Sequence, residues 1–469
     1  MENLAEKLKE ILGEKGWVTG AGAAPWQRDW LNRYGEMPLG VARPNSTAQV
    51  AQVMAACHAA GVVVVPQGGN TGLCGAAVLG AAGGVILQMS RMAAIAAPDP
   101  ASGTLLVEAG VVLAQVHAAL EASGQMFPLH LGAEGSAQIG GLIGTNAGGS
   151  QAFRYGMMSD LVLGLEVVFA DGTVWDGLRA VQKDNAGYAL RRLFCGAEGS
   201  LGIVTRAVLR LHPEPAQRAT ALLALPDMEA AVALGLHLRA EMGEFLAGLE
   251  FFSDLGLSLA LKHVAGLALP LQSRGGCYLL VEVTAGSARV PLEDILGAAL
   301  EWGMEAGLVS DGALATSEAQ RAAFWRLREE QPEGQRLEGP QLKHDISVPP
   351  GRIAAFVSAG AVICQALVPG VRINPFGHLG DGNIHYNLTP PEGAADFAGQ
   401  AGALALQLAR LATGMGGSFA AEHGLGRAKI GLADALRPAS ERGAMRAIKR
   451  AFDPAGLLNP GVILAEIDK

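Results

Sequence analysis

Apolar and polar residues along the N-terminal part of the chain predict alternating helices and buried strands. Ser46 or Thr47 is a favoured first residue for a helix, which the apolar periodicity carries to about Ala60. The apolar run that follows, Val62–Val65, predicts a buried strand that ends at Pro66. Such alternation is expected of a layered α/β region. Further strands are predicted near Gly84–Gln88, Thr104–Ala109 and Ala207–Leu211, with a helix from about Val112 to Ala122.

A boundary is predicted at His212-Pro213-Glu214-Pro215, because two prolines in four residues stop regular structure. The segment after it mixes helical and strand periodicities and is expected to form a separate α+β domain. Its predicted elements are helices over Met228–Glu241, Pro291–Glu305 and Ala319–Glu329 and a strand over Cys277–Thr284. The chain closes with a predicted helix over Ser440–Phe452.

Two uncharged stretches, Ala55–Ser90 and Ile353–Val371, need to be compared with membrane spans. The first is interrupted by Pro66 and many glycines, and the second contains a serine, a glutamine and a proline. Both are therefore predicted to be buried core, and no transmembrane segment is expected. The N-terminus is charged and lacks the apolar core of a secretory signal, which predicts a cytoplasmic protein.

Composition limits the classes of partner. Of the 469 residues, 50% are apolar and 17% are charged, which excludes a largely disordered chain despite the 64 glycines. A net charge of −9 without a run of Lys or Arg argues against nucleic acid, because phosphate neutralisation dominates such affinity. Five cysteines, odd in number and without a CxxC pair, suit a reducing compartment.

Glycine is concentrated in three loops of the N-terminal region. The first is 66–75 (PQGGNTGLCG), the second spans Gly132–Gly149, and the third is 195–205 (CGAEGSLGIVT). Because glycine has no Cβ atom, its backbone N–H groups can approach a pyrophosphate closely. Ordinary turn chemistry is the alternative for any single loop, but three loops together favour a phosphate-bearing cofactor. None has the GxGxxG spacing of a Rossmann site or a Walker lysine, which disfavours nicotinamide or P-loop binding.

The segment 377–387 (GHLGDGNIHYN) predicts a hairpin that carries two histidines. Asp381-Gly382 suits a type I′ turn, which needs positive φ at both central residues. A two-residue turn there would place His378 directly opposite His385, on the same face of the ribbon. Strand alternation then sorts the remaining side chains by face. Asn383 and Asn387 are expected on the histidine face, and Ile384 and Tyr386 on the other.

Two imidazoles on one face form a candidate metal site. Glu422 can supply a third, carboxylate ligand and complete the His₂-carboxylate set, with an open position, of catalytic metal sites. The adjacent His423 then stays free as a base. The alternative is a pair of surface histidines on an ordinary hairpin and an unrelated Glu-His pair, and spacing alone leaves both open.

Six motifs, in this order, resemble the FAD-linked D-2-hydroxy-acid dehydrogenases of the vanillyl-alcohol oxidase / p-cresol methylhydroxylase (PCMH) superfamily. They are PQGGNTG (66–72), LGAEGSAQIGG (131–141), TNAGG (145–149), EGSLGIVT (198–205), the 377–387 segment and EHGLG (422–426). The resemblance covers nearly the whole chain and is greatest to the D-2-hydroxyglutarate and D-lactate dehydrogenase branch. It implies an α+β fold with a PCMH-type FAD-binding domain over 1–214 and a separate α+β substrate cap domain over 215–421 that carries the hairpin. A C-terminal helical segment, 422–469, then returns to the FAD domain.

The resemblance also implies roles for individual residues. FAD is expected to be non-covalent, because Asn70 stands where some relatives tether the flavin through a histidine. His378, His385 and Glu422 match metal ligands for one divalent ion, zinc or manganese, and His423 matches the catalytic base. Arg328 and Lys343 match residues that bind substrate carboxylate, and Asn387 matches a polar substrate contact. The residues expected to hold FAD are Pro66, Gln67, Gly68, Gly69, Asn70, Thr71, Gly72, Leu131, Gly132, Gly135, Ser136, Gly140, Gly141, Thr145, Asn146, Gly148, Gly149, Glu198, Gly202, Ile203 and Asn459.

The expected reaction is the oxidation of a D-2-hydroxy acid to the 2-oxo acid, with D-2-hydroxyglutarate narrowly preferred. One departure bears on the substrate: Pro332 stands where the hydroxyglutarate enzymes carry a threonine, which removes a hydroxyl donor for a distal carboxylate. A D-lactate dehydrogenase or a glycolate-oxidase-like subunit is the alternative. Outside this class stand a non-catalytic flavin-binding electron-transfer subunit and a metal-dependent hydrolase without flavin.

Partners are less defined by the sequence. The resemblance implies an electron acceptor such as an electron-transferring flavoprotein, a quinone or a cytochrome, and a homodimer is a further expectation. The identities of the acceptor, the metal and the hydroxy acid stay open at this point.

Overall fold

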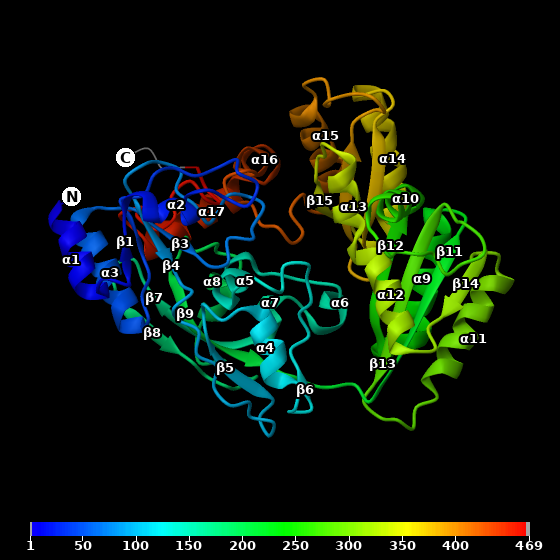
Figure 1. The fold of residues 1–469 in the computed structure, drawn as a ribbon, viewed down its shortest axis with the longest axis horizontal. Helices are drawn as coiled ribbons and strands as arrows, with labels where there is room; N and C mark the ends of the chain where they lie inside the picture. The colour runs from blue at the N-terminus through cyan, green and yellow to red at the C-terminus, as the bar shows by residue number, and fades with distance from the viewer. Residues whose placement is uncertain (1, 466–469) are drawn as a thin grey trace. The chain divides into compact units, whose positions relative to one another are not determined.

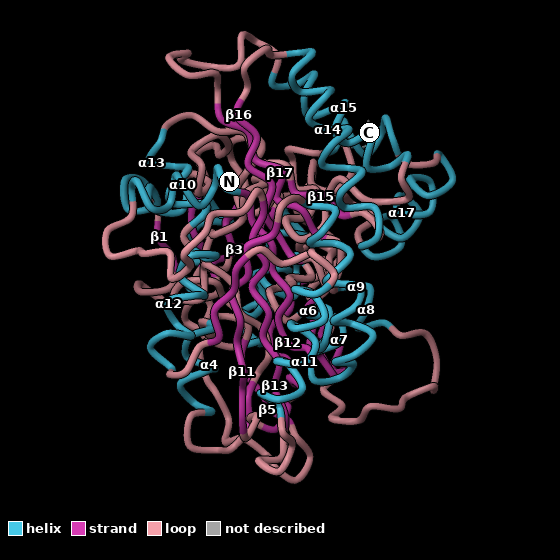
Figure 2. Tube along the Cα trace, turned by 90° about the vertical axis from the view of Figure 1, so that its right-hand side faces the viewer, coloured by secondary structure: helices cyan, strands magenta, loops and turns pink. Residues whose placement is uncertain are grey.

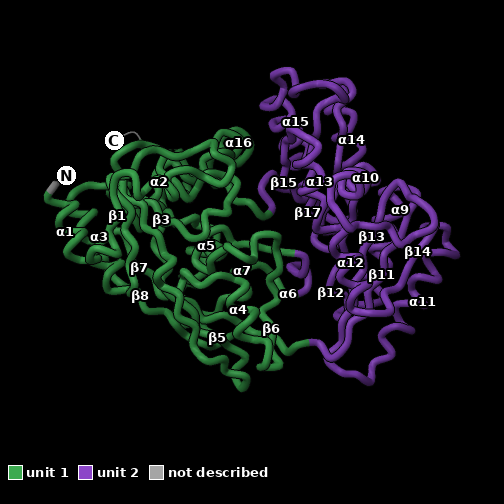
Figure 3. Tube along the Cα trace, in the orientation of Figure 1, with its two compact units in different colours: residues 1–149, 155–214, 422–469 green, residues 150–154, 215–421 purple. Residues whose placement is uncertain are grey.

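The computed structural model describes residues 2–465, and the chain divides into two compact units (Figure 3). Unit 1 consists of residues 1–149, 155–214 and 422–469, and unit 2 of residues 150–154 and 215–421. The chain leaves unit 1 after Glu214 and returns to it at Glu422. The C-terminal segment thus belongs to the same compact unit as the N-terminal region.

The first sheet of unit 1 has four short strands, three of them parallel. Across the sheet these are β1 (Trp17–Val18), β2 (Gly40–Ala42), β4 (Val85–Gln88) and β3 (Val64–Gln67). Strands β2, β4 and β3 are parallel, and β1 is antiparallel to β2. Strand β3 continues through Pro66, so the predicted end at that residue was wrong. A proline is tolerated there because β3 lies at the edge of the sheet.

The second sheet of unit 1 is antiparallel, in the order β5 (Thr104–Glu108), β9 (Ile203–Arg210), β7 (Val162–Val168) and β8 (Val174–Gly177). The α/β alternation predicted for this region therefore does not continue beyond β4. Residues 89–103, between β4 and β5, contain no helix. A parallel neighbour needs a crossover, usually helical, so β5 starts a new sheet and pairs with β9 instead. The two remaining strands, β6 (Gln125–Met126) and β10 (His212–Pro213), pair with each other.

Helices pack around these sheets and close the core of unit 1 (Figure 1). Lys449, in the last of them, lies buried and donates hydrogen bonds to the carbonyl oxygens of Ser200 and Leu458 and to the carboxylate of Asp453. These contacts fix the C-terminal segment against the third glycine loop. The helices of this region are α1 (Glu2–Leu12), α2 (Ala24–Gln27), α3 (Thr47–Ala60), α4 (Leu113–Leu120), α5 (Ile139–Thr145), α7 (Met158–Leu161), α8 (Leu190–Phe194), α16 (Ile430–Leu436) and α17 (Ala439–Phe452). In the short helix α6 (Ala152–Tyr155), residues 152–154 belong to unit 2 and Tyr155 to unit 1.

Unit 2 is built on one seven-stranded antiparallel sheet. Its middle strands run side by side in Figure 2. Every residue of β13, CYLLVEVTA, is buried, so this strand is covered on both faces. The order across the sheet is β14 (Asp311–Leu314), β11 (Gln217–Leu225), β13 (Cys277–Ala285), β12 (Leu246–Ser253), β16 (Arg372–His378), β17 (Asn383–Thr389) and β15 (Asp345–Ser347).

Helices cover both faces of this sheet, and strand alternation decides which side chains each face receives. One face packs Leu223, Phe251 and Val281 against α9 (Met228–Met242), α11 (Leu292–Glu305), α14 (Ile353–Leu367) and α15 (Ala401–Gly414). The other packs Leu222 and Phe252 against α10 (Asp254–His263) and α12 (Glu318–Glu329), beside α13 (Gln331–Glu338). The second face also carries the polar residues described below.

One segment is less buried than predicted. The stretch Ile353–Val371 was expected to be buried core, but only 28% of the window Pro350–Leu367 is buried. Helix α14 buries Phe356, Gly360 and Cys364 on its inner side and exposes Val362 on its outer side. By length and composition alone, this window is one in the described chain that could cross a membrane.

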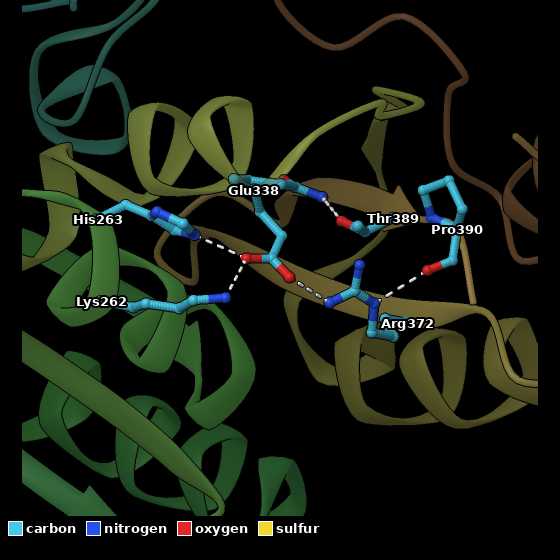
Figure 4. A network of polar contacts seen from close by, with 7 residues as sticks. Lys262, His263, Glu338, Arg372, Thr389 and Pro390 are labelled. Atoms are coloured by element: carbon cyan, nitrogen blue, oxygen red, sulfur yellow. Dashed lines mark hydrogen bonds and ion pairs between the residues drawn. The ribbon is translucent and has the colours of Figure 1, made fainter. Parts of the chain in front are cut away.

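A charged network closes the end of the β16–β17 hairpin at which β16 begins (Figure 4). The carboxylate of Glu338, the last residue of α13, lies 2.6 Å from Nε2 of His263 and accepts hydrogen bonds from Lys262 at 2.8 Å and Arg372 at 2.6 Å. Arg372 also donates to the carbonyl oxygen of Pro390. The hydrogen bonds from His263, Lys262 and Arg372 lower the pKa of Glu338 to about 2. The network therefore connects α10 and α13 to the hairpin.

Replacing Glu338 with Gln is expected to lower the free energy of unfolding by about 1–2 kcal/mol at neutral pH, because the donors lose an ionised acceptor. The folded-state pKa lies below the ordinary value of 4.5, so the stabilisation is present above that value and is lost as pH falls toward 2. Urea unfolding of wild type and variant at several pH values measures both effects. Glu333→Gln is the matched control, because its pair with Arg336 is exposed. Equal losses in the two variants would contradict the prediction.

Candidate active site

The β16–β17 hairpin forms, but with a different register from the one predicted. His378 pairs with Asn383, and Phe376 pairs with His385. A four-residue loop, 379–382, replaces the two-residue turn, and the N–H of Gly382 donates to the carbonyl oxygen of His378. Leu379 cannot pair with Ile384 because it is fully buried in the core and its N–H donates to Leu249 of the neighbouring strand.

The two histidines nevertheless share a face. The register differs from the prediction by two residues, and a shift by an even number keeps each side chain on its side of the sheet. The rings of His378 and His385 lie with their centroids 5.7 Å apart. Ile384 and Tyr386 lie on the opposite, core face, as predicted, and both are fully buried. Asp345 of the edge strand β15 pairs with His385 across the ladder, so a carboxylate also lies next to this ring.

A buried carboxylate positions His378. Glu250 of β12 is the cross-strand partner of His378, and its Oε1 lies 2.6 Å from the ring Nδ1. Its Oε2 lies 2.9 Å from the guanidinium of Arg328 in α12. Glu250 is 1% exposed and Arg328 is 6% exposed. This order of groups, carboxylate to imidazole, is the one that fixes the tautomer and orientation of metal-binding histidines.

Several polar atoms near Glu250 are buried and have no hydrogen-bond partner among the described residues. They include Nε of Arg328, Oε1 of Gln331 and Oδ1 of Asn383. Buried polar groups without a partner are costly, and in a folded protein they indicate an ion, a water or a ligand. Arg328 also packs over the ring of Phe376, 5.0 Å from its centroid. A guanidinium with a buried free N–H is therefore available on the histidine face.

Asn387 takes part in an internal amide network. Oε1 of Gln335 in α13 accepts hydrogen bonds from Asn387 at 3.0 Å and from Asn374 at 3.4 Å, and its Nε2 donates to Thr389. All four residues are buried. The predicted contact of Asn387 with substrate remains a prediction, but its amide N–H already serves to hold α13 on the sheet.

Two further positions bear on the substrate: Pro332, the departure from the family pattern, and Lys343, a predicted carboxylate-binding residue. Pro332 is one of the first residues of α13, where a missing N–H removes no helical hydrogen bond. Lys343 is exposed in the segment between α13 and β15. The departure at Pro332 thus has a local structural use, which is to start α13 directly after α12.

In unit 1 the glycine loops approach one another closely. A Cβ atom on Gly69 would lie 1.9 Å from the carbonyl oxygen of Ser136, and one on Gly149 would lie 2.1 Å from that of His130. A Cβ atom on Gly199 would meet the ring of Pro66. These glycines let the loops pack together. Other glycines of the same loops face open space, with nothing within 4 Å of an added Cβ atom: Gly72, Gly132, Gly135 and Gly141.

This open side fits the predicted cofactor. Glycines that face space rather than protein leave backbone N–H groups accessible to a large phosphate-bearing ligand. Several of the predicted FAD residues use their side chains within the protein instead. Gln67 donates to Trp26 and Ala77, and Asn70, at a φ of 54°, donates to Arg28. For these residues a cofactor contact through the backbone stays a prediction.

Glu198 holds the segment that follows His423. The carboxylate of Glu198 accepts hydrogen bonds from the backbone N–H groups of Leu425 at 2.8 Å and Gly426 at 2.9 Å. Burial raises the pKa of Glu198 to about 7, although these hydrogen bonds act in the opposite direction. Its own carbonyl oxygen accepts from Asn459. Glu198, predicted to bind FAD, therefore fixes the backbone that follows the Glu422-His423 pair, and Asn459, also predicted to bind FAD, holds the backbone of Glu198.

Sequence analysis missed Glu250, Gln335 and Asp345. A signal existed for Glu250, because it is the single charged residue in the apolar strand LAGLEFFS. Charged residues are almost never fully buried unless paired, so a charge in such a strand points to a buried partner. Nothing in the local sequence indicates that the partners of Glu250 are His378 and Arg328.

Comparisons with known proteins agree with the predicted fold and with FAD as the cofactor. Residues 214–463 match the family model "FAD linked oxidases, C-terminal domain", and residues 38–177 match an FAD binding domain. The chain is 37% identical over 461 residues to the mitochondrial D-2-hydroxyglutarate dehydrogenase of Arabidopsis thaliana, which covers 97% of this chain and 80% of that protein. It is 38% identical over 443 residues to the D-2-hydroxyglutarate dehydrogenase of Xanthomonas citri pv. viticola, covering 94% and 92%.

Among solved structures, p-cresol methylhydroxylase has a TM-score of 0.76 at 17% identity, with 100% of this chain and 98% of that chain covered. This similarity confirms the predicted PCMH-type fold. The matched family models and the extent of identity to the two dehydrogenases confirm the family that the motifs indicated. The chain belongs to the FAD-linked D-2-hydroxy-acid dehydrogenases.

Proposed function

We propose that this enzyme oxidises D-2-hydroxyglutarate, in preference to D-lactate or glycolate-type hydroxy acids, to the 2-oxo acid. The observation that carries the proposal is the buried chain from Arg328 through Glu250 to His378. It places a carboxylate-binding guanidinium on the same face as paired imidazoles, and a 2-hydroxy acid offers a carboxylate beside a hydroxyl group. The names of the two dehydrogenase relatives support the choice of substrate.

FAD is proposed to bind non-covalently in the glycine loops of unit 1. The glycines that face open space support this, as does Asn70 in place of a tethering histidine. Bound FAD supplies the acceptor for the hydride from C2 of the substrate.

His378, His385 and Glu422 are proposed to hold one divalent metal, zinc or manganese. Such an ion lowers the pKa of the substrate hydroxyl and orients it. The Nδ1 of His378 faces Glu250, so its Nε2 is the ligand atom in this proposal. Asp345, opposite His385, is a second candidate for the carboxylate ligand, since imidazole and carboxylate donors suit either metal.

His423 is proposed to accept the hydroxyl proton. Glu198 would keep the backbone after His423 in place through Leu425 and Gly426. Arg328 and Lys343 would bind substrate carboxylate through charge-assisted hydrogen bonds. Because Pro332 offers no donor, binding of the distal carboxylate depends on these two cations.

The remaining assignments stay predictions. They are an electron-transferring flavoprotein, quinone or cytochrome as acceptor, a homodimer and a cytoplasmic location. The electron acceptor would be identified by testing which of these candidates the substrate-reduced protein reduces.

The direct test of the proposed function is an anaerobic screen of D- and L-2-hydroxy acids against the bound flavin. We expect D-2-hydroxyglutarate to bleach the yellow absorbance faster than D-lactate and the L-isomers to have no effect. Acid precipitation of the same preparation should release the chromophore to the supernatant. Faster bleaching by D-lactate would move the assignment to the alternative substrate, and a protein that no hydroxy acid bleaches would remove the dehydrogenase assignment.

The metal ligands and the base should separate by mutation. His385→Ala is expected to lose the metal and the activity but keep the flavin spectrum. His423→Asn should keep both flavin and metal while kcat/KM falls by at least about 10²-fold, the usual contribution of a general base. Elemental analysis and flavin absorbance measure these outcomes. Comparison of Glu422→Gln with Asp345→Asn shows which carboxylate is a ligand. Metal loss in His423→Asn with retention in His385→Ala would reverse the two roles.

Glu250→Gln is expected to weaken metal binding about 10–100-fold, because a ligand histidine loses the carboxylate that orients it. Removing one partner of a buried ion pair should also cost about 3–5 kcal/mol of stability. Glu282→Gln is the matched control: Glu282 is equally buried at 1% exposure and pairs with Arg321, away from the histidines. It should lose stability but not metal affinity. Equal metal affinities in the two variants would contradict the positioning role of Glu250.

A further inference from the structure

A second group of metal-ligating side chains lies in unit 1, and none of these side chains belongs to the metal, base or substrate sets proposed above. His117 lies on α4, and His130 and Glu134 lie on the loop between β6 and α5. Nδ1 of His117 is 3.3 Å from Oε2 of Glu134, and Nδ1 of His130 is 2.9 Å from Oε1. One donor atom from each residue lies within 4.8 Å of the others. Two imidazoles and a carboxylate therefore converge on one point.

The position of these donors is fixed by the backbone around them. The N–H of Leu131 donates to Oε1 of Glu134, and the N–H of Ala114 in α4 donates to the carbonyl oxygen of Glu134. The two rings lie with their centroids 4.7 Å apart. The loop therefore holds the carboxylate between the rings before any ligand arrives, which lowers the ordering cost of binding.

The charge of the site suits a cation. A glutamate carboxylate ordinarily carries a negative charge at neutral pH, and Glu134 brings one within 3.3 Å of both Nδ1 atoms. A neutral imidazole offers a nitrogen lone pair, so both rings and the carboxylate can bind one cation.

We propose that His117, His130 and Glu134 form a second metal site that takes a zinc-class divalent cation. Ligands about 2.1 Å from a tetrahedral zinc ion lie about 3.4 Å from one another, close to the two nitrogen–oxygen distances found here. Imidazole donors select zinc, copper or nickel over calcium and magnesium, which prefer oxygen ligands alone. The side chains are 23%, 47% and 31% exposed, so an ion can enter from solvent.

The site adjoins the second glycine loop. Leu131, Gly132 and Gly135, three residues predicted to contact FAD, are interspersed with the ligands His130 and Glu134. Gly149 of the same glycine-rich region packs against the backbone of His130. A cation bound here would tie this loop to α4 and so limit its motion around the flavin. The site binds metal irrespective of which hydroxy acid the enzyme oxidises.

The test is a metal count on the flavin-loaded full chain, first stripped of metal with a chelator and then dialysed against Zn²⁺. His117→Ala and Glu134→Gln should each bind one zinc ion per chain fewer than wild type. His237→Ala, a histidine stacked on Trp302 in unit 2, is the control and should bind as many as wild type. His385→Ala removes only the ion of the proposed active site, so the loss of each ion is counted separately. The loss of zinc in His117→Ala and Glu134→Gln is therefore expected even if the proposed function is wrong.

A second readout covers the case in which a variant folds poorly. Saturating Zn²⁺ should raise the temperature at which the flavin is released from the His385→Ala protein, and this rise should disappear in His385→Ala/His130→Ala. His130 is the most exposed of the three ligands, so its replacement disturbs the fold least. An unchanged zinc count in both His117→Ala and Glu134→Gln, or an unchanged shift after His130→Ala, would overturn the proposal and leave the group as a hydrogen-bonded contact between α4 and the loop.

Discussion

The candidate active site depends on one buried carboxylate, that of Glu250. With 1% of its surface exposed, it is stable as an anion only if cations or hydrogen-bond donors surround it. Arg328 supplies one contact and His378 the other, and the two come from a helix and a strand far apart in sequence. The pairing of β12 with β16, the docking of α12 and the orientation of the His378 ring are therefore coupled through a single side chain.

Buried or half-buried carboxylates also anchor the helices along the sheet face that carries the histidines. The carboxylate of Glu282 accepts hydrogen bonds from Arg321 and Trp325 of α12. The carboxylate of Glu338 binds Lys262 and His263 of α10 and Arg372 of β16. Apolar contacts hold most of α9, α11, α14 and α15 to the opposite face, with single hydrogen bonds from Tyr386 to the carbonyl oxygen of Val357 in α14 and from Arg239 in α9 to that of Gly380. Hydrogen bonds and ion pairs thus hold α10 and α12 on the face that carries the histidines. Such contacts fix position more narrowly than apolar packing does, which suits a face that must present Arg328 and His378 in register.

The glycines of the unit 1 loops have two physical roles: some allow close packing of protein segments, and others leave the backbone open. Gly69, Gly149 and Gly199 are glycines because a Cβ atom would strike protein, whereas Gly72 and Gly132 face space. The first group assembles the loops, and the second leaves the surface that suits FAD. Glu198 extends this arrangement to the residues after His423, so the cofactor loops and the proposed base share one backbone framework.

The sequence by itself determined the periodic elements, the motifs and hence the family. Helices such as Met228–Met242 and strands such as Cys277–Ala285 follow from local periodicity, and Ile384 and Tyr386 lie on the core face because alternation is a local property. Only the tertiary structure decided the hairpin register, because the burial of Leu379 outweighs the preference of Asp381-Gly382 for a two-residue turn. It also decided the partners of Glu250 and Glu198. Contacts between residues far apart in sequence depend on how whole elements pack, and no local pattern encodes that packing.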